Sequence, residues 1–159
     1  MPDVIHSLPD HLAAESELME SFVALLQKEQ EAIKGGDTQA MEHITAEKMT
    51  LVAALNRQSD NRNQFLSTCG LQHDRTGIEA WLAENPKAAH IADLWGQLKK
   101  LVAEAKELNL LNGKLISMRM QHNQQLLNAL VTTSRSHNSL YGPDGQPTQL
   151  SGRRIIDAA

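Results

Sequence analysis

The feature that most constrains the fold is a long apolar stripe in the second half of the chain. Between Pro86 and Leu140, the only internal helix-breaking residues are two glycines, Gly96 and Gly113. The apolar residues recur at heptad-like spacing: Ile91, Leu94, Trp95, Leu98, Leu101, Val102, Ala105, Leu108, Leu111, Leu115, Ile116, and then, more thinly, Leu126, Leu127, Leu130 and Val131. This spacing predicts one amphipathic α-helix that starts at Pro86 and ends near Leu140. A bend near Gly113 stays open, since an internal glycine costs about 1 kcal/mol relative to alanine.

A second helical stripe runs through the first 34 residues. Leu8, Leu12, Met19, Phe22, Leu26 and Ile33 alternate at spacings of four and three, and the rhythm is interrupted at Glu15 and Glu29. Ser7 is a candidate N-cap, and the sequence Lys34-Gly35-Gly36 is typical of a helix end. We therefore expect a helix over about 8–34.

The next helix is predicted to run from Asp37, as its N-cap, to Gly70. Its apolar face is expected to comprise Met41, Ile44, Leu51, Val52, Leu55, Phe65, Leu66 and Cys69. The stretch 56–64 is polar throughout, which favours a bend or break there. Because the connecting turn is so short, the first two helices should pack antiparallel.

A short third helix is predicted just before the long one. Thr76 and Glu79 have the spacing of a capping box, and Pro86 should end the helix near Asn85. Trp81 and Trp95 flank this corner and are expected to anchor the short helix on the long one. The fold class is thus all-α: an antiparallel hairpin or bundle of three to four helices with one very long C-terminal helix.

Composition supports this fold class. Aromatic residues make up only 3% of the 159 residues, which argues against an all-β fold. No apolar run reaches the roughly 20 residues that span a bilayer, the N-terminus lacks a signal-peptide pattern, and Cys69 is the single cysteine. We expect a cytoplasmic protein with one helical domain, residues 1–140, and a flexible Gly- and Pro-containing tail, residues 141–159.

Charge is distributed unevenly along the chain. Residues 1–112 contain 10 basic and 17 acidic side chains, whereas residues 113–159 contain 5 basic and 2 acidic ones. An acidic body with a mildly basic end is not typical of a nucleic-acid-binding protein, which clusters Lys and Arg on one face. Neither nucleic acid nor membrane insertion is therefore expected.

No catalytic, cofactor or metal motif is found. None of the seven histidines has the spacing of a metal site, and the chain lacks the glycine-rich phosphate loops and the nucleophile elbow. A histidine phosphotransfer module is a remote alternative, because neither His43 nor His90 is followed by the expected Lys-Gly pair. We expect no enzyme activity, no cofactor and no metal.

The predicted helix lengths do not match. Helices of about 40 and 48 Å cannot cover one of about 80 Å, so about 20 residues near 119–140 should extend past the bundle. This segment has an apolar stripe among uncharged polar residues, a pattern that indicates a binding surface for a partner helix. Folding back, self-association or fraying are the alternatives.

Three motifs together resemble the FlgN-type flagellar export chaperones. They are the Gly35-Gly36-Asp37 turn, the N-x-x-N-G-x-L-I stretch from Asn109 to Ile116 with Arg119 after it, and the YGPDGQ stretch from Tyr141 to Gln146. The resemblance implies a cytosolic, ATP-independent chaperone. It implies binding to the C-terminal helical segments of the hook-filament junction (hook-associated) proteins, and delivery to the flagellar type III export apparatus.

The candidate client-binding residues lie on the predicted extension and its flanks. They are Leu126, Leu127, Leu130, Val131 and Leu140, followed by Leu115, Ile116 and Arg119. Tyr141 is a candidate contact for the client or the export apparatus, with a helix-end anchor as the alternative role. A second function class is a self-associating coiled-coil structural or adaptor protein. A chaperone that forms only a weak homodimer is also compatible with this sequence.

Overall fold

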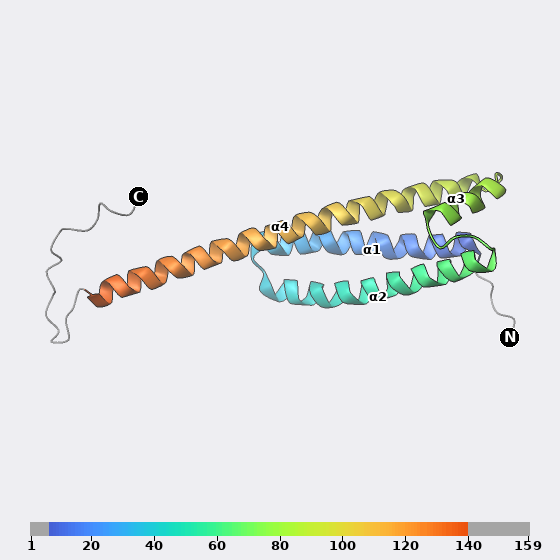
Figure 1. Ribbon diagram of the computed structural model, residues 1–159. Helices are drawn as coiled ribbons and strands as arrows, with labels where there is room; N and C mark the ends of the chain where they lie inside the picture. The colour runs from blue at the N-terminus through green and yellow to red at the C-terminus, as the bar shows by residue number, and fades with distance from the viewer. Residues whose placement is uncertain (1–6, 140–159) are drawn as a thin grey trace. The chain divides into compact units, whose positions relative to one another are not determined.

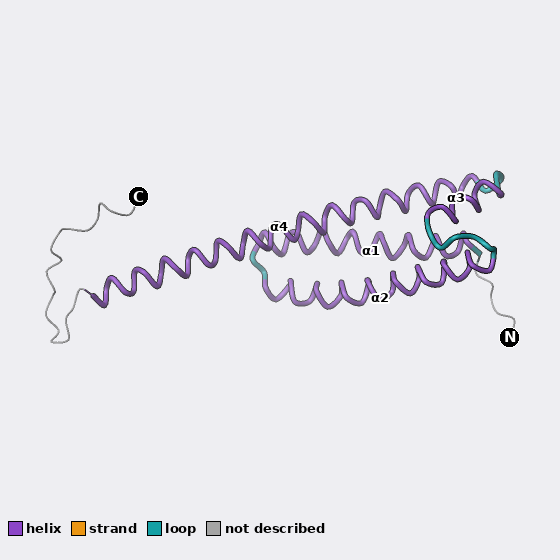
Figure 2. The backbone as a smooth tube through the Cα atoms, in the orientation of Figure 1, coloured by secondary structure: helices purple, strands orange, loops and turns teal. Residues whose placement is uncertain are grey.

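The computed structural model describes residues 7–139 as four helices, with side-chain exposure described as far as Ser136. They are α1 (Leu8–Gly35), α2 (Thr38–Thr68), α3 (Arg75–Glu84) and α4 (Ala89–Ser139), joined by loops, and no strand occurs in the described range (Figures 1 and 2). The predicted all-α class with one long last helix is confirmed. The chain divides into two units, with unit 1 ending at Ile116 and unit 2 beginning at Ser117.

The turn between α1 and α2 is built by glycine. Gly36 adopts a left-handed conformation with a φ of 67°, and its N–H donates to the carbonyl of Ile33 over 3.2 Å. Asp37 then caps α2, since its carboxylate accepts from the Ala40 N–H over 3.0 Å. The chain therefore reverses within a few residues, and α2 runs antiparallel to α1 as predicted (Figure 1).

The apolar core of unit 1 lies on both sides of α1. Toward the N-terminal end of α1, Leu8 and Leu12 pack with Leu66, Ile78 and Leu98, contributed by α2, α3 and α4. Farther along α1, Val23 and Leu26 pack with Ala105 of α4. On its other side, Leu25 and Ala32 pack with Ile44 of α2. Residue numbers rise together along α1 and α4, so these two helices run parallel within unit 1.

Two buried carboxylates explain the interruptions in the α1 stripe. Glu15 accepts from the guanidinium of Arg62, and Glu29 accepts from the ammonium of Lys48 over 3.2 Å. Each glutamate replaces an apolar core residue but keeps a cation from α2 as its partner. A buried charge is tolerated only with such a partner, because desolvation of a lone carboxylate costs several kcal/mol.

The break that the sequence allowed over 56–64 does not occur, because α2 is continuous to Thr68. The polar stretch remains helical since its side chains find polar partners on α1. Gln58 lies 3.1 Å from Nδ1 of His11 and donates to the His11 carbonyl, while Arg62 pairs with Glu15. A polar run can thus belong to a packed helix face when the facing helix is polar at the same positions.

Several local predictions also need correction. The N-cap of α3 is Asp74, whose carboxylate accepts from the Gly77 N–H over 3.2 Å, and not Thr76. Glu79 accepts from Arg75 instead of closing a capping box. The long helix begins at Ala89 and not at Pro86, because the preceding residues form a turn in which the Ala88 N–H donates to Asn85.

On α2, two residues assigned to the apolar face are exposed. Val52 is 41% exposed, and Cys69 lies at the exposed C-terminal cap of the helix. The anchoring role predicted for Trp81 and Trp95 is confirmed, since both pack against the core that includes Ile78 and Leu98. The predicted tail, residues 141–159, lies outside the described residues.

Candidate binding surface

Unit 2 presents an exposed apolar stripe on α4. Leu126, Leu127, Leu130 and Val131 are between 51% and 66% exposed, and every residue of 117–136 is exposed. Their spacings of three and four place them on one face of the helix, at about 100° per residue. We call these four residues the unit 2 stripe. So much apolar surface on one helix face is typical of an interaction site.

Uncharged polar side chains surround the unit 2 stripe. Residues 117–139 carry only two charged side chains, Arg119 and Arg135, and no carboxylate. The rest is rich in Gln, Asn, Ser and Thr. Such flanks allow close approach of a partner helix without the desolvation of charges, and they set no strong electrostatic preference.

The helix of unit 2 has weak intrinsic stability. Thr132, Thr133 and Ser136 each donate their hydroxyl to the carbonyl four residues earlier, over 2.8 to 3.0 Å. Such bonds compete with the backbone ladder, and Thr, Ser and Asn are poor helix formers. Without carboxylates, the segment also lacks the acid–base pairs that support solvated helices. Packing against a partner would therefore stabilise it.

The remaining predicted site residues lie in different environments. Leu115 and Ile116 are half-buried at the end of unit 1, whereas Arg119 is an exposed residue of unit 2. Leu140 and Tyr141 lie outside the described residues. The structure thus describes seven of the nine predicted contacts and places five of them in unit 2.

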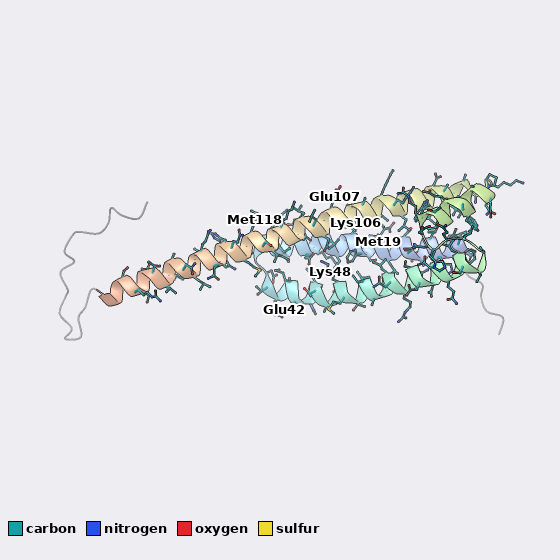
Figure 3. All side chains as sticks on the ribbon, viewed as in Figure 1. Met19, Glu42, Lys48, Lys106, Glu107 and Met118 are labelled. Carbon is teal, nitrogen blue, oxygen red and sulfur yellow. The ribbon has the colours of Figure 1, made fainter. Side chains whose placement is uncertain are left out.

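The motif residues Asn109 and Asn112 belong to a polar network within unit 1. The Asn112 amide is 1% exposed and donates to the Leu26 carbonyl over 2.8 Å and to the Glu29 carboxylate over 2.9 Å. Lys48 of α2 (Figure 3) donates to the same carboxylate and to Oδ1 of Asn109 over 2.8 Å. Asn112 and Lys48 therefore attach α4 and α2 to α1 at Glu29. This part of the motif is structural.

Sequence reasoning missed two exposed methionines and this network. Met118 and Met120 are 64% and 66% exposed in unit 2 (Met118 in Figure 3). Met120 precedes Leu127 by seven residues, so it lies on the same helix face, whereas Met118 does not. The spacing to Leu127 was available in the sequence and could have added Met120. The pairing of Glu29 with Lys48, by contrast, could not be predicted from the sequence, because it depends on which residue of α2 faces Glu29.

No group of three or more His, Cys, Asp or Glu side chains in residues 7–139 is arranged to hold a metal ion. Among the helices that the structure describes, none has the length and apolar character of a membrane span. The unit 2 stripe is the candidate functional surface because its four apolar side chains are exposed.

Comparison with known proteins identifies the family. The family described as FlgN protein matches residues 1–149. This chain belongs to the FlgN family. A flagella synthesis protein FlgN of Proteus mirabilis is 32% identical over 142 residues, covering 86% of this chain and 88% of that protein. One of Yersinia enterocolitica is 28% identical over 156 residues, covering 96% and 98%. No solved structure matches the chain.

The FlgN match extends over both units. It includes the polar network around Asn112 and the unit 2 stripe. The curated FlgN relatives are named for flagella synthesis, and the alignments include 88% and 98% of their own length. Flagellum biogenesis is therefore the process in which the exposed surface of this FlgN chain should be interpreted.

Proposed function

We propose that this FlgN-family chain is an ATP-independent cytoplasmic export chaperone. Its clients would be the hook-associated proteins of the hook-filament junction, bound through their C-terminal helical segments. The chaperone would prevent their premature assembly and deliver them to the flagellar type III export apparatus. The observation that carries the proposal is the unit 2 stripe, an exposed apolar helix face on a chain whose relatives are named for flagella synthesis.

The chemistry of the stripe suits an amphipathic client helix. Leu126, Leu127 and Leu130 are each at least half exposed, so burial of each contributes about 1 kcal/mol or more. A client helix would present its own apolar face, which then no longer drives aggregation. Binding to a folded chaperone shifts the client away from association by mass action.

The loss of conformational entropy on binding favours release of the client. Both the client segment and the weakly helical unit 2 lose conformational entropy on binding, which offsets part of the contact energy. The resulting affinity is moderate, as a chaperone that must surrender its client needs. The uncharged flanks contribute little to affinity, so the complex should depend weakly on salt.

The test is isothermal titration of the full chain against C-terminal peptides of the two hook-filament junction proteins. A flagellin C-terminal peptide is the control. We expect saturable binding of the junction peptides only. Absence of heat with either junction peptide, at concentrations where sedimentation shows a monomer, would contradict the proposal.

Self-association through the same stripe is the competing outcome. In a structural coiled-coil protein, the stripe would be buried between two copies. Sedimentation with and without peptide distinguishes the two functions: a monomer or a dimer dissociated by the client supports the chaperone. An obligate dimer that the peptide leaves intact supports the structural protein.

A further inference from the structure

A basic cleft lies within unit 1 and shares no residue with the unit 2 stripe. It has a volume of about 430 Å³ and is lined by residues of all four helices. Its charged lining comprises Glu15 of α1, Arg62 of α2, Arg75 of α3, and Lys99 and Lys106 of α4 (Lys106 in Figure 3). Four cations therefore surround one carboxylate, in a chain whose formal net charge is −4.

The single carboxylate does not neutralise this cleft. Glu15 already accepts from Arg62, and Arg75 pairs with Glu79 over 3.1 Å. Lys99 lies over the ring of Trp95, with its Nζ 5.5 Å from the centroid. Neither Lys99 nor Lys106 forms an ion pair with any residue that the structure describes. Two cations thus remain for an external anion.

Two buried donors of the lining are also without acceptors. Nε of Arg62 and Nε1 of Trp95 have no hydrogen-bond partner within residues 7–139. Arg62 is held in place by burial, since its side chain is only 13% exposed. A buried donor without an acceptor costs about 1–3 kcal/mol, and such groups in native proteins usually find a partner. An entering carboxylate could supply that acceptor after a small rearrangement of the lining.

The remaining lining is apolar and extended. Trp95, Leu98 and Val102 line the cleft at spacings of three and four along α4. They form a wall of about 10 Å along the helix axis, and Lys99 and Lys106 are separated by a similar distance. A compact inorganic anion would contact one cation and leave this wall uncovered. A peptide with alternating acidic and apolar side chains would cover both.

We propose that this cleft binds an acidic segment of a partner protein, in which carboxylates lie beside apolar side chains. The carboxylates pair with Lys99 and Lys106, and an apolar side chain packs on the partly exposed Trp95 and Val102. Charge complementarity decides the occupant, because the cleft offers cations and unpaired N–H donors to its ligand. The inference concerns unit 1 alone and does not depend on what the unit 2 stripe binds.

The experiment is a titration of the ¹⁵N-labelled full chain followed by NMR. The probe is a blocked peptide with two glutamates two helical turns apart and leucines between them. Trp81 and Trp95 give the two indole N–H resonances of the chain, so Trp95 reports on the cleft and Trp81 serves as an internal reference. We expect the Trp95 resonance to shift saturably and the Trp81 resonance to remain in place.

Matched variants separate a specific site from general attraction. Lys99→Gln with Lys106→Gln should weaken peptide binding about tenfold, because charge-assisted hydrogen bonds are lost. Lys100→Gln with Lys114→Gln removes the same charge from the same helix at exposed positions outside the cleft lining, and should leave binding unchanged. Equal weakening by both pairs would overturn the proposal.

Two further probes complete the test. The same peptide with glutamine in place of glutamate should bind at least about tenfold more weakly. Equal affinity of the glutamine peptide would overturn the role of charge. Inorganic phosphate should not reproduce the Trp95 shift at the peptide's concentration; if it does, the cleft is a simple anion site and the proposal is wrong.

Discussion

The amide of Asn112 donates to the carboxylate of Glu29, with 2.9 Å between Nδ2 and Oε2. This bond joins α4 to α1 across 83 residues of sequence, and Lys48 of α2 donates to the same carboxylate. Three helices of unit 1 therefore converge on one buried charge. A charge that is shared in this way fixes which residues face each other, because other registers would leave it unpaired.

Asn112→Asp tests this relationship with a nearly isosteric change. It replaces a donor by a second carboxylate beside Glu29, so we expect a loss of about 3 kcal/mol or more in the free energy of unfolding. Urea denaturation followed by circular dichroism measures it. Asn109→Asp is the control, since it places a carboxylate beside Lys48 and should be neutral or slightly stabilising. Equal losses in both variants would show that Glu29 does not organise this region.

For the pair of Glu15 and Arg62, we predict that the first substitution lowers the free energy of unfolding and that the second restores it. Arg62→Leu leaves the Glu15 carboxylate buried without its partner and should cost about 3 kcal/mol. Adding Glu15→Leu removes that charge and restores the apolar stripe of α1, so the double variant should recover most of the loss. Thermal unfolding of the single and double variants checks this. A double variant no more stable than Arg62→Leu would mean that the pair is required for packing.

Gly77 and Gly113 should respond differently to alanine. A Cβ at Gly77 would lie 1.9 Å from the carbonyl oxygen of Gln72, whereas a Cβ at Gly113 meets nothing within 4 Å. Gly77→Ala should therefore destabilise the protein by at least about 1 kcal/mol, because backbone must move. Gly113→Ala should stabilise it by about 0.5–1 kcal/mol, since alanine favours the interior of α4. Chemical denaturation of both variants decides whether this order holds.

Amide hydrogen exchange should differ along α4. In the free monomer we expect residues 117–136 to exchange at least about 100-fold faster than residues 98–112, which belong to the packed unit 1. Client peptide should slow exchange in 117–136 selectively, because partner packing stabilises this helix. Equal protection of both stretches without client would be incompatible with a helix that depends on its partner.

Much of the fold could be predicted from local patterns. The caps at Ser7 and Asp37, the turn at Gly36 and the apolar periodicity each act within a few residues. The continuity of α2 could not be predicted, because Gln58 and Arg62 are stabilised by residues 47 positions earlier. The N-cap of α3 was missed since Asp74 precedes Thr76 and competes with it for the same helix end.

Of the two candidate binding surfaces, one could be predicted from the sequence and the other could not. The unit 2 stripe follows from spacing alone, because residues three and four apart share a helix face. The basic cleft could not be found in the sequence. Its cations come from α2, α3 and α4, and their neighbours along the chain give no sign that they line one cavity. Only the packing of four helices brings Arg62, Arg75 and Lys99 together.

The most direct test of the central claim is peptide binding by Leu127→Asp with Leu130→Asp. These changes place charge on the unit 2 stripe, and binding of the junction-protein peptides should fall by at least about 100-fold, while helicity and melting temperature change little. Gln125→Asp with Asn128→Asp is the matched control, with the same charge and spacing on the opposite face of the helix. The account predicts full binding by the control pair. Full binding by the leucine pair, or equal loss in both, would contradict it.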